Sequence, residues 1–383
     1  QCTIAEMCLR LLMRASVSHS PSRDYLMTVP GLVDCVVENL QFHADHHDTC
    51  ANVVTKSCGL LATLGHHLNQ RTSRKNFKID NVNVSKIIIA AVRPLLLNPN
   101  PVTEALRFFS GHTVDMEEGA EIGIYDFIVE CLNIHVHDRS VVFAASSALC
   151  LVSGTFTVDK TFEGVPRGLF PVLLSALQFF HKDADVCSMV FRAMNNYCEF
   201  WVSRSEFMAS QGMDVLIDCL TWSDEEDFTN AVLSFVTSIA KVDSDCYDHI
   251  YPLGADTGSW QDKSDAQEKA WKAKWSAELT SSLLDQLFHV VVGAGNDAKA
   301  RRIAALTAVF VRHCAVVTDP GPYARKIFDL VLPFRIHIDD FHSTDALKNA
   351  VLAVSRFIDL TEDIVQNQLA KVFEVAADYH KAP

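Results

Sequence analysis

The sequence predicts an all-α fold, a right-handed α-solenoid of about eight stacked helical repeats. The main observation is a recurring figure in which a glycine opens an apolar helix, a polar break follows, and a second apolar helix completes the unit. This figure begins at Gly123, Gly168 and Gly212, at intervals of 45 and 44 residues. No stretch alternates apolar and polar residues at the period of two that is typical of strands. The fixed period indicates repeats that bury their apolar faces against their neighbours.

Five helices are predicted ahead of the first clear repeat. The polar stretch 18–24 predicts a break after the first helix, and 29–31 predicts the start of the next unit. A basic polar segment, 70–78, interrupts the pattern. Pro99 and Pro101 indicate the connection between the last two of these helices, because proline disrupts a helix interior. The five predicted helices are 6–16, 31–40, 51–65, 86–97 and 102–110.

The three clear repeats supply six further helices, two for each glycine. In each of them apolar residues recur at the spacing of a helix face. The six predicted helices are 123–132, 141–154, 168–177, 185–200, 212–220 and 228–240.

The last third of the chain departs from the period. Residues 243–263 carry two glycines and a proline among several aspartates and predict an inserted loop. Residues 264–292 predict one extended helix, with Asp265 at the positive end of its dipole. We expect a single solenoid over 1–383, and a start inside a helix at Gln1 indicates a piece of a longer protein. The remaining predicted helices are 298–314, 324–334, 344–358 and 362–380.

Composition narrows the class of protein. The chain is 49% hydrophobic and 21% charged, which is typical of a fully folded protein. Its net charge of −14 argues against general nucleic-acid binding. No apolar run is long enough to span a bilayer, since Arg93 and Pro94 interrupt the best candidate. Most of the twelve cysteines lie in apolar helical stretches, which predicts reduced thiols packed in the core and a cytosolic location. The cysteines placed in such stretches include Cys35, Cys58, Cys131, Cys150, Cys187 and Cys219.

The second helices of several units end in a shared pattern, Ala followed by four mostly apolar residues. It appears as ALRFF (105–109), ALCLV (148–152), AMNNY (193–197) and AVSRF (353–357). This pattern resembles the close of the third helix in armadillo repeats, roughly Ala-Leu-x-Asn-Leu. Nearly the whole chain is similar to the armadillo family or to the HEAT-like repeats nearest to it. The resemblance implies a fold and leaves the function open.

Peptide-binding armadillo proteins hold an extended ligand with one Asn per repeat, which pairs with the ligand backbone. Only Asn196 matches that ladder here. The other repeats carry Thr63, Phe108, Leu151, Ser238 and Arg356, with Ala308 or Arg312 in a unit whose register stays open. Four residues earlier, where cargo-importing members place Trp, the chain has Gly59, Glu104, Ser147, Arg192, Ser234 and Leu352. Binding of a basic import signal is therefore not expected.

The resemblance implies a partner-binding surface in the concave groove. Since the Asn ladder is missing, specificity is expected from side chains, and the arginines favour carboxylate or phosphate groups. The expected ligand is an acidic or phosphorylated extended segment of a protein. The residues expected to bind it are Arg192, Asn196, Ser147, Leu151, Ser234, Ser238 and Arg356.

A second candidate surface lies on the extended helix. Trp271 and Trp275 share one face at spacing i,i+4, and Trp260 lies just upstream. Tryptophan is a frequent anchor of protein interfaces. The alternative, which we favour, is that the pair fixes the long helix to the solenoid.

Metal binding and catalysis are the weaker alternatives. Histidines and a cysteine gather at 43–50, with His66 and His67 further on, but they lack the spacing of a tetrahedral metal site. There is no HExxH, GxSxG, Walker lysine or kinase signature. No catalytic, cofactor-binding or metal-ligating residues are therefore predicted.

Taken together, the sequence predicts a non-enzymatic protein–protein interaction scaffold in the cytoplasm, with an association to the cytoskeleton as a further option. The alternative is a structural subunit built permanently into a large cytoskeletal or ciliary assembly. The partner and the oligomeric state stay open.

Overall fold

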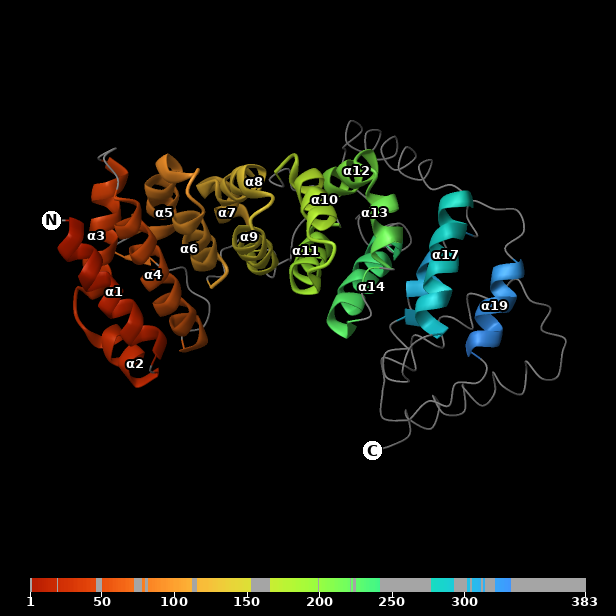
Figure 1. Cartoon of the computed structure of the whole chain (residues 1–383), viewed down its shortest axis with the longest axis horizontal. Helices are drawn as coiled ribbons and strands as arrows, with labels where there is room; N and C mark the ends of the chain where they lie inside the picture. The colour runs from red at the N-terminus through yellow and green to blue at the C-terminus, as the bar shows by residue number, and fades with distance from the viewer. Residues whose placement is uncertain are drawn as a thin grey trace, which may run out of the picture. The chain divides into compact units, whose positions relative to one another are not determined.

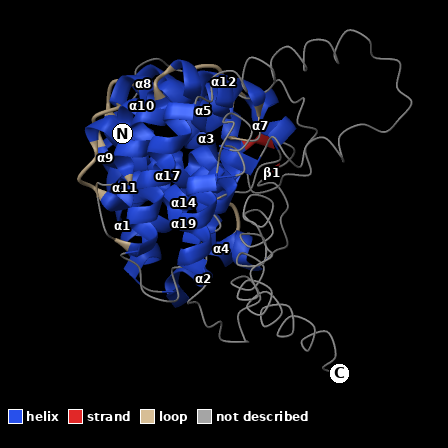
Figure 2. Ribbon diagram, turned by 90° about the vertical axis from the view of Figure 1, so that its right-hand side faces the viewer, coloured by secondary structure: helices blue, strands red, loops and turns tan. Residues whose placement is uncertain are grey.

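A computed structural model describes most of the first two thirds of the chain and part of the remainder. It forms two compact units, Gln1–Ser210 and Gln211–Pro383, and each is described by itself. Helices make up nearly all of the described chain (Figure 2), as the sequence predicts. The exception is an antiparallel pair of two-residue strands, β1 (Lys78–Ile79) and β2 (Val82–Asn83). The described residues are 2–18, 20–45, 50–71, 78–79, 82–111, 116–152, 166–198, 200–220, 222, 225–241, 277–292, 302–303, 305–310, 313 and 321–331.

The first unit contains the strand pair, one 3-10 turn and twelve labelled helices, which Figure 1 shows following one another from α1 to α12. The 3-10 turn η1 (Arg93–Leu95) follows α5. The helices are α1 (Cys2–Ser18), α2 (Ser20–Thr28), α3 (Leu32–Asp45), α4 (Ala51–Arg71), α5 (Val84–Val92), α6 (Pro99–Phe109), α7 (Met116–Ile122), α8 (Ile124–His135), α9 (Arg139–Val152), α10 (Leu169–Phe179), α11 (Ala184–Tyr197) and α12 (Trp201–Ala209).

The helices of the first unit pack in two rows. In one row α1 contacts α4, α4 contacts α6, α6 contacts α9, and α9 contacts α11. In the other row α3 contacts α5, α5 contacts α8, α8 contacts α10, and α10 contacts α12. Each long helix also contacts its neighbour in the chain across the rows, as α8 does with α9 and α10 with α11. This packing of each helix against its sequence neighbours is compatible with a helical repeat protein.

The core lies between the two rows and is rich in aromatic side chains. Phe109 of α6 meets Phe127 of α8 edge to face, with ring centroids 6.1 Å apart. Tyr125 of α8 and Tyr197 of α11 meet in the same way at 6.3 Å. These four side chains are at most 2% exposed. Burying one large apolar side chain is worth about 1.5–3 kcal/mol, so contacts of this kind dominate the stability of the unit.

A residue with a left-handed backbone recurs at the start of the first long helix of a period. Gly31, Gly123 and Gly168 have φ of 74°, 83° and 83°, directly before α3, α8 and α10. In the second unit Gln211 takes this conformation, with φ of 56°, and Gly212 is the first helical residue. The predicted helix starts at Gly31, Gly123, Gly168 and Gly212 are confirmed to within one residue, and Gly212 is the first residue of α13. The left-handed residue before α13 is a glutamine, for which this conformation is less favourable than for glycine.

The structure adds short helices that the sequence pattern of two helices per period does not predict. They are α2, α7 and α12, and each ends just before a residue of positive φ. The predicted polar break at 18–24 is wrong, because most of it forms the start of α2. Likewise Pro99 and Pro101 lie inside the first turn of α6, where a missing N–H leaves no helical hydrogen bond unmade.

The second unit is described in part. Its helices are α13 (Gly212–Cys219), α14 (Glu226–Lys241), α17 (Ala277–Val292) and α19 (Gly321–Val331), and α13 contacts α17. Thr280 Oγ1 lies 2.7 Å from Nδ1 of His313, and both side chains are buried. Of the extended helix predicted over 264–292, residues 277–292 form α17, and residues 264–276 lie outside the described residues. The predicted loop at 243–263 and helices at 344–358 and 362–380 lie outside the described residues.

The nine cysteines whose side chains are described are free thiols. Cys58, Cys131, Cys187 and Cys219 are buried, as predicted, whereas Cys35 is exposed on α3 and departs from the prediction. Among the described helices none is long and apolar enough to cross a membrane.

Candidate partner-binding groove

Side-chain caps fix the starts of the two helices, α6 and α9, that line the candidate site. Asn98 caps α6, with its Oδ1 accepting from the Asn100 N–H at 3.1 Å. Asp138 lies directly before α9, and its Oδ1 accepts from the N–H groups of Ser140 and Val141 at 2.9 and 3.1 Å. Such side chains satisfy N–H groups that have no partner inside the helix. The two caps therefore fix where the first turns of the neighbouring helices begin.

A groove of about 250 Å³ lies between α6 and α9, and we call it the α6–α9 groove. Its lining combines two arginines, three serine hydroxyls, the half-buried ring of Phe143 and the buried methyl of Ala144. Spacing of three and four residues places Ser140, Phe143 and Ser147 on one face of α9. The lining residues are Arg107, Ser110, Arg139, Ser140, Phe143, Ala144 and Ser147.

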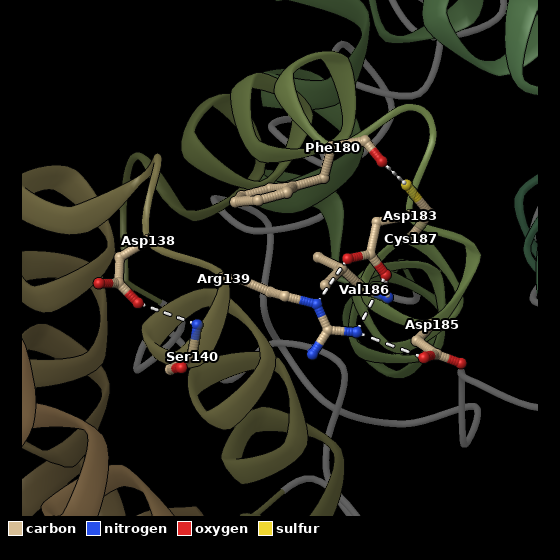
Figure 3. A network of polar contacts seen from close by, with 8 residues as sticks. All are labelled: Asp138, Arg139, Ser140, Phe180, Asp183, Asp185, Val186 and Cys187. Carbon is tan, nitrogen blue, oxygen red and sulfur yellow. Dashed lines mark hydrogen bonds and ion pairs between the residues drawn. The ribbon is translucent and has the colours of Figure 1, made fainter.

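Arg139 is held in place by the next helix of its row (Figure 3). Its Nε donates to Oδ2 of Asp183 at 2.6 Å, and its Nη2 donates to Oδ1 of the same carboxylate at 3.2 Å. Nη2 also donates to Asp185 at 3.3 Å. The hydrogen bonds from Arg139 lower the pKa of Asp183 and raise that of the guanidinium. Asp183 is itself the N-cap of α11, where it accepts from the N–H of Val186.

Arg107, on the α6 side of the groove, is paired within its own helix. Its Nη1 donates to Oε1 of Glu104 at 3.0 Å, one turn earlier. The other oxygen of Glu104 lies against the backbone of α4, where a Cβ on Gly59 would stand 3.0 Å from it. The close approach of α4 to α6 thus keeps the Glu104 carboxylate beside Arg107.

The groove places guanidinium and hydroxyl donors beside Phe143 and Ala144. Each guanidinium has five N–H donors, and the bonds above use only some of them. Arg107 is 58% and Arg139 54% exposed at the side chain, so both remain within reach of a ligand. The carboxylates beside them orient the guanidinium groups and also limit the local positive charge. Selectivity is therefore expected to rest on hydrogen-bond geometry more than on net charge.

In the first unit the predicted site residues lie on two helices, α9 and α11. Ser147 lines the α6–α9 groove, and Leu151 is exposed at the end of the same helix. Arg192 is exposed on α11. Burial raises the pKa of Cys150 to about 12, and the positive charge of Arg192 makes this rise smaller than burial alone would. Asn196 is half-buried, and its Nδ2 donates to the carbonyl of Cys150 at 3.1 Å. Asn196 therefore ties α11 to α9 in addition to any contact with a ligand.

The other predicted residues do not join this groove. Ser234 is exposed and Ser238 half-buried on α14 of the second unit. Phe108, which matches the ladder by position, is buried, and its neighbour Arg107 reaches the groove instead. Four predicted residues, Arg356, Trp260, Trp271 and Trp275, lie outside the described residues.

Sequence reasoning missed six of the seven lining residues, all except Ser147. The available signal was the helical stripe that runs back from Ser147 to Phe143 and Ser140 at spacings of four and three. Arg139 carries no such signal, because its role depends on carboxylates 44 and 46 residues away.

The histidine-rich segment gives no metal centre within the described part of the chain. His43 is buried on α3, and Cys50 is half-buried before α4. No group of three His, Cys, Asp or Glu side chains able to hold a metal ion occurs among the described residues. His46 and His47 lie outside the described residues, and nothing is described of the side chains of His66 and His67.

Comparisons with known proteins add little to this geometry. No protein-family model and no curated protein matches the sequence. Among solved structures the chain is similar to an engineered protein at 15% identity, with 91% of this chain and 95% of that chain covered and a TM-score of 0.44.

Proposed function

We propose that this chain is a non-enzymatic scaffold of the armadillo or HEAT-like kind, which binds an extended acidic or phosphorylated segment of a partner protein. The observation that carries the proposal is the α6–α9 groove, where two arginines lie beside three serines, Phe143 and Ala144. Arginine forms paired hydrogen bonds to carboxylate and phosphate, which gives both affinity and orientation.

The arrangement of helices supports the choice of family. The rows of the first unit repeat a short helix, a residue of positive φ and two longer helices, as in α7, Gly123, α8 and α9. Three helices per unit is the pattern that the resemblance to armadillo repeats implies. We extend the same unit to a single solenoid of about eight repeats over the whole chain. A cytoplasmic location is part of this proposal and rests on the free, mostly buried cysteines.

A peptide-binding experiment tests the proposal. The probes are three fluorescent extended peptides of equal length, with phosphoserine, aspartate or lysine at a central position. Fluorescence anisotropy with the full chain should show the phosphoserine and aspartate peptides bound and the lysine peptide not bound. Arg107→Gln should weaken binding by about 1–3 kcal/mol, since it removes a charged donor from the groove.

The matched control is Arg93→Gln. Arg93 is also exposed and also paired with a glutamate, Glu130 at 3.4 Å, but it does not line the groove. Equal loss of binding in both variants would mean that only general charge matters. Arg192→Glu tests whether the ligand continues to α11, where it should lower affinity further. Normal binding in Arg107→Gln and Arg192→Glu would favour the alternative, a structural subunit of a cytoskeletal or ciliary assembly.

A further inference from the structure

The two arginines of the α6–α9 groove leave different donors for a ligand. A guanidinium group binds an anion most firmly through two parallel N–H groups, either Nε with Nη2 along its side or Nη1 with Nη2 at its end. The contacts that each arginine already makes within the chain decide which of these pairs is still available. They therefore also decide how many oxygens of one ligand the groove can hold.

Arg139 has no such pair available. Its Nε and Nη2 donate to the two carboxylate oxygens of Asp183 at 2.6 and 3.2 Å, and Nη2 also donates to Asp185 at 3.3 Å (Figure 3). The two N–H groups of Nη2 are thus shared between two carboxylates. Nη1 makes no hydrogen bond within the described part of the chain, so it is the nitrogen that Arg139 can offer to a ligand.

Arg107 keeps the pair along its side. Its Nη1 donates to Oε1 of Glu104 at 3.0 Å, and among the described residues its guanidinium group makes no other polar contact. Nε and Nη2 can therefore hold two oxygens of one anion together. The Glu104 side chain is 18% exposed, so it is itself held by packing, and its bond to Nη1 limits the directions in which the pair can point.

The donors left on the two helices match an anion with three oxygens. Nε and Nη2 of Arg107 on α6 can bind two of these oxygens, and Nη1 of Arg139 on α9 can donate to the third from another direction. The hydroxyls of Ser140 and Ser147, which line the same groove and make no hydrogen bond within the described chain, can donate as well. A phosphate monoester has three such oxygens in a tetrahedral arrangement, whereas a carboxylate has two in one plane.

Net charge does not select phosphate in this groove. Glu104, Asp183 and Asp185 contact the two arginines, so carboxylates outnumber guanidinium groups. The second negative charge of a phosphate therefore gains less here than it would in a cluster of unpaired arginines. A preference for phosphate must come from the number and the directions of the donors.

A phosphorylated protein segment suits the groove better than a phosphorylated lipid headgroup. The half-buried ring of Phe143 lies beside the donors and gives the residues that flank a phosphorylated side chain an apolar contact. A bilayer rich in anionic lipid would in addition face a chain whose net charge is −14.

We propose that the α6–α9 groove binds a phosphate monoester on an extended protein segment in preference to a carboxylate. This refinement rests on the proposed function and names the chemistry of its ligand. Arg107 anchors either anion through Nε and Nη2. Arg139 sets the preference, because its Nη1 binds the third oxygen, which a carboxylate lacks.

The test uses three fluorescent extended peptides of equal length, with phosphoserine, aspartate or cysteic acid at the central position. The sulfonate of cysteic acid has the charge and the chain length of aspartate but three tetrahedral oxygens, so it separates geometry from charge. Fluorescence anisotropy with the full chain at neutral pH should show the phosphoserine peptide bound at least about tenfold more tightly than the aspartate peptide. The cysteic acid peptide should also bind more tightly than the aspartate peptide, by about threefold or more.

Lysine replacements, which keep the charge, assign the roles of the arginines. In Arg139→Lys the ammonium group can pair with Asp183 but has no second nitrogen for the ligand, so binding of the phosphoserine peptide should weaken by about tenfold. Binding of the aspartate peptide should change by less than about threefold, and the preference is then lost. Arg107→Lys removes the parallel pair and should weaken binding of both peptides by about fivefold or more. Arg93→Lys, at an exposed arginine outside the groove, is the matched control and should leave all affinities unchanged.

Equal affinity for the phosphoserine and aspartate peptides would overturn this refinement and leave the proposed function standing. If neither peptide binds, both are overturned together. Cysteic acid bound no better than aspartate would also overturn the refinement, because charge would then explain the preference for phosphate. So would inorganic phosphate that binds as tightly as the phosphoserine peptide, since the segment would then contribute nothing. Binding of vesicles that contain phosphatidylinositol phosphate, without binding of any peptide, would show that the ligand is a lipid and would overturn it as well.

Discussion

The carboxylate of Asp183 links the groove to the next helix and allows a quantitative prediction. It caps α11 through the Val186 N–H and holds Arg139 through two hydrogen bonds. Two replacements separate these roles. Asp183→Asn keeps a side chain that caps well but removes the charge, whereas Asp183→Ala removes both the cap and the ion pair.

The expected magnitudes follow from exposure. The Asp183 side chain is 26% and that of Arg139 54% exposed, so solvent screens the pair. We therefore expect the ion pair between Asp183 and Arg139 to contribute about 0.5–1 kcal/mol to the free energy of unfolding, near the upper end for exposed pairs. The cap adds about 1 kcal/mol. Asp183→Asn should then lower the free energy of unfolding by about 0.5–1 kcal/mol, and Asp183→Ala by about 1.5–2 kcal/mol.

The pH dependence gives an independent check on the same pair. Because the folded-state pKa of Asp183 is lowered, mainly by the hydrogen bonds from Arg139, its stabilising contribution is present above the unfolded pKa of about 4. It is lost as the pH falls through the folded pKa below that value. The difference in stability between the unmodified chain and Asp183→Asn should thus be constant from about pH 5 to 8 and should shrink below about pH 4.

Hydrogen exchange measured by mass spectrometry in α9 and α11 provides a local readout, with urea unfolding as the global one. Arg139→Gln completes a double-mutant cycle with Asp183→Asn, and the coupling should be about 0.2–1 kcal/mol and should fall in high salt. The reasoning is refuted if Asp183→Asn destabilises as much as Asp183→Ala. It is also refuted if the cycle shows no coupling at neutral pH.

Three further predictions concern other parts of the chain. Glu206 accepts hydrogen bonds from the N–H groups of residues 168 and 170 at the start of α10, at 2.6 and 3.4 Å. Glu206→Gln should therefore lower the free energy of unfolding by about 1–2 kcal/mol in a urea titration. The control Glu130→Gln should lower it by less than about 0.5 kcal/mol. Gly123→Ala should lower the free energy of unfolding by about 1–2 kcal/mol, because residue 123 has a φ of 83°. Gly119→Ala, inside α7, should leave it unchanged or raise it by up to about 1 kcal/mol. Melting temperatures that shift in the same direction in both variants would contradict this prediction. Burial lowers the pKa of His313, so its contribution to the stability of the second unit is present above the unfolded pKa of about 6.5 and is lost as the pH falls below that value. Amide exchange in α17, corrected for intrinsic rates, should therefore rise as the pH is lowered from about 7.5 to 5.5. Unchanged exchange would count against this role of His313.

The extent of sequence prediction differs between long and short elements. The long helices of the first unit, such as α8, α9 and α11, are predicted correctly because their apolar residues recur over three or more turns. α2, α7 and α12 have only seven to nine residues each, too few for periodicity to separate them from polar connections. The sequence also gives no sign of the left-handed backbone at Gln211, because glycine marks such a site and glutamine does not.

The residues of the candidate site are predicted less completely than the helices. Ser147 is predicted because one helix and one spacing rule place it. Arg139 is not, because its orientation comes from Asp183 and Asp185 on the next helix of the row. The hydrogen bond from the Asn196 amide to the carbonyl of Cys150 is not predicted from the sequence either, because it joins residues 46 positions apart.

By itself the sequence determined the helical class, the period near 45 residues and the apolar face of each long helix. These are local properties, set by the spacing of side chains within one or two helices, and they need no knowledge of the neighbours. The tertiary structure alone decided which polar residues share a groove. This depends on how closely helices more than 35 residues apart approach each other, as Arg139 and Asp183 do across 44 residues. Hydrogen bonds and exposure are properties of that approach, and no spacing rule along the chain encodes them.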